Sequence, residues 1–244
     1  TSYMSVYTDD IDVVGPDKGV LEKIRLVMNK AWNCKIVPSN FMLGVQRDIY
    51  MEEGVKKVRM SQAAFFENAF DEFELYTKSY KTSSKYPKIP LPAGVVINKS
   101  MAAKDDEEKK LVLEMGCQKL AGCVLWGARG CCPESLWAAS QVCSVMSCPS
   151  RKAFDLAIGV LAFQYPVRER GIVFSSDGNE EPILLADASF KIDPHAGKTQ
   201  CGTLALLHGG PIIAVSKKIP YVALSTPHAE LCAMNYAART AAWL

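Results

Sequence analysis

Two acidic positions in this sequence have the residue types and the setting to hold divalent metal ions. The first is Asp9-Asp10, which stands between the β-rich segments Ser5–Thr8 and Ile11–Val14. That pattern predicts a hairpin with both carboxylates at its tip. Hard divalent cations prefer carboxylate oxygens, and a two-metal site shares such oxygens between ions ~3.5–4 Å apart. Turns also favour Asp for local hydrogen bonding, so the pair by itself leaves an ordinary turn as the alternative.

The second acidic position joins a strand to a helix. Asp187 follows the apolar run Ile183–Ala186, which predicts a strand, and Glu230 stands near the start of a predicted C-terminal helix. A strand acid facing a helix acid would form half of a metal site. The alternative for each residue taken singly is an exposed acid or a favourable negative charge at a helix N-terminus.

Five basic residues, in two parts of the chain, are candidates for contacts with nucleic-acid phosphates. Such contacts are made by Lys and Arg and weaken with salt. Solvated surface side chains are the alternative for each of them. The candidates are Lys56, Lys57, Arg59, Lys217 and Lys218.

Composition places these residues in an ordinary globular chain. Of 244 residues, 49% are hydrophobic and 22% are charged, which excludes collagen-like and wholly disordered proteins. The length allows one large domain or two small ones. The formal net charge of +2 indicates no particular partner.

The cysteines and the apolar runs indicate a reducing compartment and no membrane. The nine cysteines include no C-x-x-C pair, so we expect buried, reduced thiols, with a disulfide scaffold or a zinc site as the alternatives. No apolar run approaches ~18 residues and no signal peptide opens the chain, which predicts a cytoplasmic protein. Because Thr1 is not Met and Leu244 lies inside a predicted helix, we expect the sequence to be a slice of a longer one.

The elements that would position the first site are β-rich. Asp17 is suited to cap a helix over residues 20–32, and Ser61 is suited to cap another that contains Phe65 and Phe70. The acidic turn at residues 52–54 predicts that two strands flank it, over residues 41–49 and 55–60. Residues 76–100 are rich in Lys, Ser and Pro and predict an extended linker.

The rest of the chain is first helical and then β-rich again. A helix that begins with acids and continues with bases is expected after Asp105, as the helix dipole prefers. A Gly209-Gly210 turn is expected to join the last two strands. Further helices are predicted at residues 111–126, 133–146, 150–165 and 227–244, and strands at 172–175, 183–188, 202–207 and 212–215.

Tyr7-Thr8-Asp9-Asp10-Ile11 is the first of several short motifs that resemble, in the same order, the Pol polyprotein of copia-type (pseudoviral) LTR retrotransposons. It is similar to the Tyr-Val-Asp-Asp-Ile/Leu motif of the reverse transcriptase in that family. Three further segments follow in the family's order. They are Phe41-Met42-Leu43-Gly44-Val45, Met60-Ser61-Gln62 with Phe65 and Phe66, and Pro90-Leu91-Pro92.

The second half carries the longest matching block. Residues 216–230, Ser-Lys-Lys-Ile-Pro-Tyr-Val-Ala-Leu-Ser-Thr-Pro-His-Ala-Glu, resemble without a gap the family's Ser-Lys-Lys-Gln-x-x-Val-Ala-Leu-Ser-Ser-x-Glu-Ala-Glu. In that family this segment joins a strand to a helix of the ribonuclease H domain. Asp187-Ala188-Ser189 is similar to its Asp-Ala-Asp, and Lys198-Thr199-Gln200-Cys201-Gly202 to its Arg-Lys-Ser-Thr-Ser-Gly.

The resemblance implies an α+β/α/β chain in three parts. These are the C-terminal part of a reverse transcriptase palm with the start of the thumb (residues 1–92), a helical thumb and connection (93–170), and a C-terminally truncated RNase H-like domain with a mixed sheet and a helix (171–244). It further implies Mg²⁺ ions held by Asp9, Asp10, Asp187 and Glu230, which would be catalytic. The implied partners of the intact parent are an RNA template, a DNA primer and an RNA–DNA hybrid, with Tyr7 beside the nucleic acid.

Departures from the family pattern limit what this sequence is expected to do alone. The polymerase mechanism needs a third carboxylate from a preceding strand, and RNase H needs further acids after Leu244. Ser189 replaces an Asp of the family, His228 replaces a Glu, and residues 129–134 match an Arg-Pro-Asp segment only weakly. We therefore expect both active sites to be incomplete and this segment to be inactive alone. The alternatives are a decayed or domesticated remnant that binds nucleic acid or protein, and an unrelated cytosolic metal-binding protein.

Overall fold

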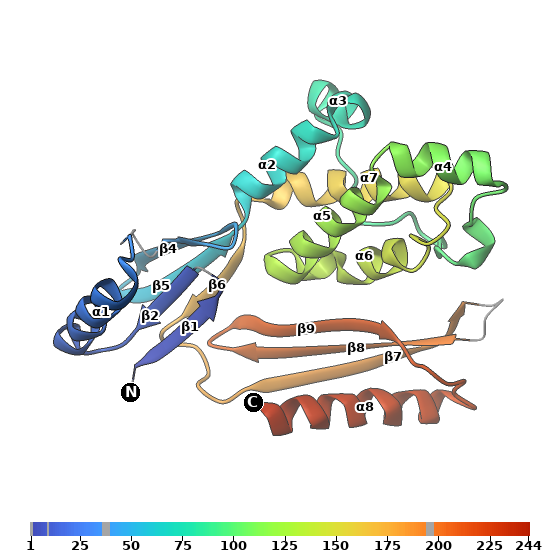
Figure 1. Ribbon diagram of the computed structural model, residues 1–244. Coiled ribbons are helices and arrows are strands. Elements are labelled where there is room, and N and C mark those ends of the chain that lie inside the picture. Colours follow the sequence, from blue (N-terminus) through green and yellow to red (C-terminus); the bar gives the residue numbers. More distant parts are fainter. Residues whose placement is uncertain (1, 9, 36–39, 194–197) are drawn as a thin grey trace.

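A computed structural model describes residues 2–8, 10–35, 40–193 and 198–244 and shows an α+β protein (Figure 1). The described residues form eight α-helices and three antiparallel sheets. The helices α2 to α7 gather at one end of the molecule, and the sheets with α1 and α8 lie beside and below them (Figure 1). No described helix is long and apolar enough to cross a membrane.

The predicted N-terminal hairpin is confirmed. Strands β1 (Tyr3–Tyr7) and β2 (Asp10–Val14) pair antiparallel, and Tyr7 is opposite Asp10. The predicted helix is also confirmed as α1 (Lys18–Trp32). The Asp17 side chain accepts hydrogen bonds from the N–H groups of Gly19 (2.7 Å) and Val20 (3.2 Å), which satisfies donors that the helix itself leaves free.

The second sheet joins distant parts of the chain in the order β3-β4-β5-β6. The expected strand over 41–49 is broken in two, because Leu43 (φ 54°) and Gly44 (φ 76°) adopt left-handed conformations that turn the chain back. Gly171 is required before β6, since a Cβ there would lie 2.2 Å from the Met60 carbonyl oxygen. The strands are β3 (Phe41–Met42), β4 (Val45–Glu52), β5 (Val55–Ser61) and β6 (Ile172–Ser175).

Two expectations for the segment that follows β5 are wrong. Ser61 is the last residue of β5, and Gln62 precedes α2 (Ala63–Glu72) without a side-chain capping bond. The expected linker over 76–100 begins as helix α3 (Glu74–Ser83) and ends in the short 3₁₀ helix η1 (Lys99–Met101). Buried Thr77 donates its hydroxyl to the Phe70 carbonyl (2.7 Å), so one side of α3 packs inward despite its polar composition.

The remaining helices follow the prediction with shifted boundaries. The helix expected after Asp105 is confirmed as α4, and Asp105 caps it, with its Oδ1 accepting from the Glu108 N–H at 2.8 Å. The expected helix 111–126 is two helices, because Gly116 (φ 82°) ends α4 in a left-handed conformation. The helices are α4 (Asp106–Glu114), α5 (Cys117–Gly130), α6 (Leu136–Cys143) and α7 (Arg151–Gln164), with 3₁₀ turns η2 (Pro133–Ser135) and η3 (Tyr165–Val167).

The main hydrophobic core lies among α2, α5, α6 and α7. Helix α5 approaches α2 so closely that a Cβ on Gly127 would lie 2.4 Å from the Phe66 ring. The side chain of buried Gln62 lies against Gly130 and accepts a hydrogen bond from the Cys131 N–H at 2.9 Å. These contacts fix the helical part to the residues that follow β5.

The third sheet is covered by the last helix. Strands β7 (Ile183–Asp193), β8 (Lys198–Leu207) and β9 (Gly210–Lys218) pair in chain order, and α8 (Thr226–Trp243) packs on β7 and β8. The strands and this helix are confirmed, but the expected mixed sheet is wrong for the described residues, where all pairings are antiparallel. Because β6 pairs with β5, residues 172–175 lie in the second sheet; the division into three domains stays a prediction.

All nine cysteines are free thiols. Four of them are buried, as predicted, whereas the other five are only half-buried; the buried ones are Cys117, Cys131, Cys132 and Cys201. Burial raises the pKa of the Cys131 thiol to about 12. Burial also raises the pKa of Cys117, Cys123 and Cys143. These side chains act as small apolar residues of the helical core.

A glycine pair within α5 tests the close packing of the core. Gly127→Ala should lower the free energy of unfolding by about 1–3 kcal/mol, because the new methyl group overlaps the Phe66 ring. Gly122→Ala is the matched control, since no atom lies within 4 Å of a Cβ there and alanine favours the helix by up to about 1 kcal/mol. Urea unfolding followed by circular dichroism measures both. Equal effects of the two substitutions would contradict this packing.

Thiol alkylation tests the burial of the cysteines. At pH 8.5 iodoacetamide should label half-buried Cys34 well before Cys131, because only the thiolate reacts and Cys131 stays protonated. Peptide mass spectrometry of the native protein measures the order, and the unfolded protein in urea provides the control in which all nine react. Native labelling of Cys131 at the rate of Cys34 is the opposing result.

Candidate functional site

The first acidic site lies at the end of the β1–β2 hairpin. Asp10 opens β2 with an exposed side chain, and Tyr7 closes β1 with 60% of its surface exposed. The structure therefore presents Asp10 to solvent at the turn, as the sequence predicts. Asp9 lies outside the described residues.

An ion pair that sequence reasoning missed ties this hairpin to the second sheet. Arg47 of β4 donates from Nη1 to Oδ2 of Asp12 at 2.7 Å, and both side chains are largely removed from solvent. The two residues are far apart in sequence, and no local pattern predicts their contact. Asp12 therefore positions the strand that carries Asp10.

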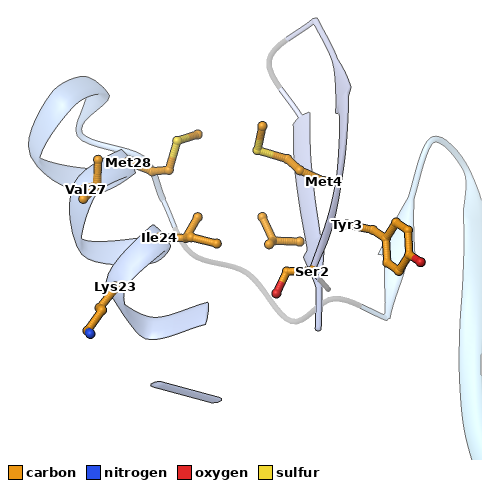
Figure 2. Close-up of a pocket in the computed structure, with 8 residues that line it drawn as sticks. Ser2, Tyr3, Met4, Lys23, Ile24, Val27 and Met28 are labelled. Carbon is orange, nitrogen blue, oxygen red and sulfur yellow. The ribbon is translucent and has the colours of Figure 1, made fainter. Parts of the chain in front are cut away.

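An apolar cavity of about 430 Å³ separates the hairpin from α1. Figure 2 shows Met4 on the strand side and Ile24 and Met28 on the helix side, facing one another across the gap. The cavity is lined near residues 2–4 and 13, at the hairpin end away from Tyr7 and Asp10. None of the predicted site residues lines it.

Two of the three predicted basic residues on β5 are already paired with acids. Arg59 donates to Asp48 at 2.9 Å, and Lys57 forms an ion pair with Glu52. The Glu52 carboxylate raises the pKa of Lys57, while hydrogen bonds from Gln46 and then Arg59 lower the pKa of Asp48. Lys56 is exposed and forms no ion pair within the described part of the chain.

The second acidic site belongs to the β7–β9 sheet and α8. Ala188 packs with Cys201 and Ala233 in the small core between the sheet and α8. Because successive strand residues point to opposite faces, Asp187 projects from the face away from α8, where it is exposed. Glu230 is half-buried in the first turns of α8. Neither carboxylate has a hydrogen bond or ion pair among the residues described. The expected arrangement, a strand acid facing a helix acid, is wrong, because Asp187 projects from the sheet face opposite the one covered by α8, the helix that carries Glu230.

The basic residues of β9 have different surroundings. The Nζ atom of Lys217 lies 3.6 Å from the centre of the Tyr236 ring of α8, a cation–π contact. Lys218 is half-buried and pairs in register with Gln200 of β8. This contact stabilises the packing of α8 against β9, a role for Lys217 that the sequence did not indicate.

The two acidic sites lie in separate sheets. No group of three or more His, Cys, Asp or Glu residues suited to a metal ion occurs among the described residues. Carboxylate oxygens are the ligands that Mg²⁺ prefers, and this ion is commonly held by one or two carboxylates with waters and substrate phosphates. The donors at each site fit Mg²⁺ in type, with few ligands from the protein.

Comparison with known proteins identifies distant relatives among retrotransposon polyproteins. The chain is 25% identical over 242 residues to the retrovirus-related Pol polyprotein from transposon TNT 1-94 of Nicotiana tabacum, a match that covers 98% of the chain and 17% of that protein. It is 23% identical to the truncated transposon Ty1-A Gag-Pol polyprotein of Saccharomyces cerevisiae, over 94% of the chain and 20% of that protein.

These comparisons establish distant homology to copia/Ty1 Gag-Pol polyproteins along nearly the whole chain. The transposon Ty1-NL2 Gag-Pol polyprotein of Saccharomyces cerevisiae gives a similar match, at 24% identity over 95% of the chain and 14% of that protein. The chain thus spans a fifth or less of the length of these relatives. No family model matches the chain. No solved structure matches it either.

Removal of the Asp12 charge tests the link between the hairpin and the second sheet. Asp12→Asn should destabilise the protein by about 1 kcal/mol, because Arg47 then loses a charged hydrogen-bond partner in a largely desolvated place. Thermal unfolding measures the change. Glu22→Gln is the matched control, since the Glu22–Arg25 pair lies on the exposed surface of α1 and its loss should leave the midpoint unchanged. A midpoint for Asp12→Asn equal to that of the wild type would argue against a positioning role.

Proposed function

We propose that this chain acts in reverse transcription as part of a retrotransposon Pol polyprotein. In this proposal the β1–β2 hairpin belongs to an RNA-directed DNA polymerase, and β7–β9 with α8 belong to an associated RNase H. The observation that carries the proposal is the homology to Pol polyproteins over 98% of the chain. The carboxylates of Asp10 and Asp187, which are exposed and unpaired among the described residues, support it.

The proposal assigns the metal ions to four carboxylates. Asp9 and Asp10 would hold Mg²⁺ in the polymerase, and Asp187 and Glu230 would hold it in the RNase H. When bound, Mg²⁺ supplies charge stabilisation for phosphoryl transfer and lowers the pKa of an attacking hydroxyl or water. The described residues contribute exposed oxygen donors at Asp10 and Asp187 and a half-buried one at Glu230. Further acids would come from other parts of the polyprotein.

The proposal also assigns the nucleic-acid contacts. On the second sheet, Lys56 is best placed to contact a phosphate, because it is exposed and has no ion pair in the described part of the chain. Lys57 and Arg59 would have to exchange their acidic partners for phosphates. Tyr7, Lys217 and Lys218 would lie beside the strands of the primer, template or hybrid.

Cleavage of an RNA–DNA hybrid tests the RNase H assignment. In the polyprotein that contains this chain, Asp187→Asn should abolish Mg²⁺-dependent cleavage of the RNA strand, because the variant loses a carboxylate ligand. Asp187 is exposed and has no partner among the described residues. The free energy of unfolding of the variant should therefore differ from that of the wild type by less than about 0.5 kcal/mol. Asp177→Asn, another exposed acid, is the control that keeps cleavage. Full cleavage by Asp187→Asn would refute the assignment.

A second candidate function is a non-catalytic remnant that binds nucleic acid or protein. The observation that favours it is the lack of any metal-binding group of three or more acids, His or Cys among the described residues. This candidate predicts hybrid binding that is the same in wild type and Asp187→Asn, without Mg²⁺-dependent cleavage by either. The same assay therefore separates the two functions.

A further inference from the structure

A ladder of aromatic rings runs from the helical core to the surface at α3. The rings of Tyr80 and Tyr86 stack with centroids 6.4 Å apart and planes 16° apart. Tyr86 stacks in turn on Tyr165 of η3 at 5.8 Å, and Tyr165 stacks on Phe70 at 4.1 Å. Phe70 is fully buried, whereas the three tyrosines are half-buried. The outer rings therefore keep part of their surface open to solvent.

The segment that carries this ladder is strongly basic. Residues 76–88 contain four lysines and no Asp or Glu, and all four lysine side chains are exposed. Lys81 forms an ion pair with Asp71 and lies 5.7 Å from the centres of the Phe70 and Tyr165 rings. Lys78, Lys85 and Lys88 form no ion pair within the described part of the chain.

A second cation lies on the ladder itself. The guanidinium carbon of Arg168 is 4.2 Å from the centre of the Tyr165 ring, and Arg168 is also paired with Glu67. Lys81 and Arg168 are thus engaged with rings and acids of the protein. The three unpaired lysines leave the surface with positive charge that no described acid neutralises.

We propose that Tyr80 and Tyr86 with Lys78, Lys85 and Lys88 form a binding surface for single-stranded nucleic acid. Unpaired bases stack on aromatic side chains, and the phosphates that alternate with them attract lysines. Bases in a duplex are already stacked on their neighbours, so the outermost ring, Tyr80, which stacks on Tyr86, selects the single strand. The identity of the strand as an unpaired template rests on the proposed function, whereas the binding surface itself does not.

Fluorescence anisotropy with a labelled oligothymidine tests the surface in the whole protein. The charge variant Lys78→Gln/Lys85→Gln/Lys88→Gln should lose three phosphate contacts. Its slope of log affinity against log salt should fall by about 2, and its affinity should fall roughly 100-fold at 0.1 M salt. The matched control is Lys99→Gln/Lys110→Gln/Lys152→Gln, which removes the same charge from exposed lysines elsewhere and should bind like the wild type.

Variants of the outermost ring separate stacking from charge. Tyr80→Leu should weaken binding roughly 5- to 100-fold without changing the salt slope, and Tyr80→Phe should restore it, because the ring is what stacks. Circular dichroism confirms that each variant is folded. Equal losses in the charge variant and its control, or unchanged binding by folded Tyr80→Leu, would overturn the proposal. Tighter binding of poly-glutamate, anionic vesicles or duplex DNA than of oligothymidine would also overturn it.

The hybrid-cleavage assay keeps this inference apart from the proposed function. If the charge variant binds oligothymidine like the wild type while Asp187→Asn abolishes cleavage, the α3 surface fails and the proposed function stands. If the charge variant loses binding while the wild type cleaves no hybrid, the binding surface is supported and the proposed RNase H activity is not.

Discussion

The contact of Gln62 and Phe66 with helix α5 joins the second sheet to the helical core. Gln62 follows β5 directly, and its side chain accepts a hydrogen bond from the Cys131 N–H at the end of α5. Four residues later, Phe66 lies against Gly127, where no Cβ would fit. Strand β5 is therefore attached to the helical core at its end, and β6 returns from that core to pair with β5. The second sheet depends on this packing at both connections.

The parts that could meet nucleic acid are arranged around this core without being part of it. The hairpin with Asp10 is joined to the second sheet through the Asp12–Arg47 pair, and α1 contributes no buried residue to hold it. The third sheet carries Asp187 on an exposed face, while Lys78 of α3 and Lys85 and Lys88 after it form no ion pair in the described part of the chain. The apolar core is therefore separate from the surface carboxylates and lysines.

Local signals made much of this fold predictable. The Asp17 cap, the Asp-Asp hairpin and the helix from residue 226 depend on neighbours in sequence, and all three were predicted correctly. Helix α3 was not predicted because its composition is rich in Lys, Ser and Thr, although the side of the helix that carries Thr77 packs inward. The pairing of β6 with β5 and the Arg47–Asp12 ion pair join distant residues, which no periodicity reveals. The motifs located the candidate acids. Only the structure shows from which face of its sheet Asp187 projects, and that Lys57 and Arg59 are paired with acids.

Hydrogen–deuterium exchange, with and without nucleic acid, tests the central claim that a rigid helical core carries separate nucleic-acid-binding surfaces. The free protein should show the strongest amide protection in α5 and α7, which line the core, and weak protection in β1, β2 and α1. Addition of a hybrid with a single-stranded overhang and Mg²⁺ should increase protection in α3, β7 and the start of α8 and leave α5 and α7 unchanged. Unchanged protection in α3 and β7 would contradict the account, as would new protection confined to α5 and α7.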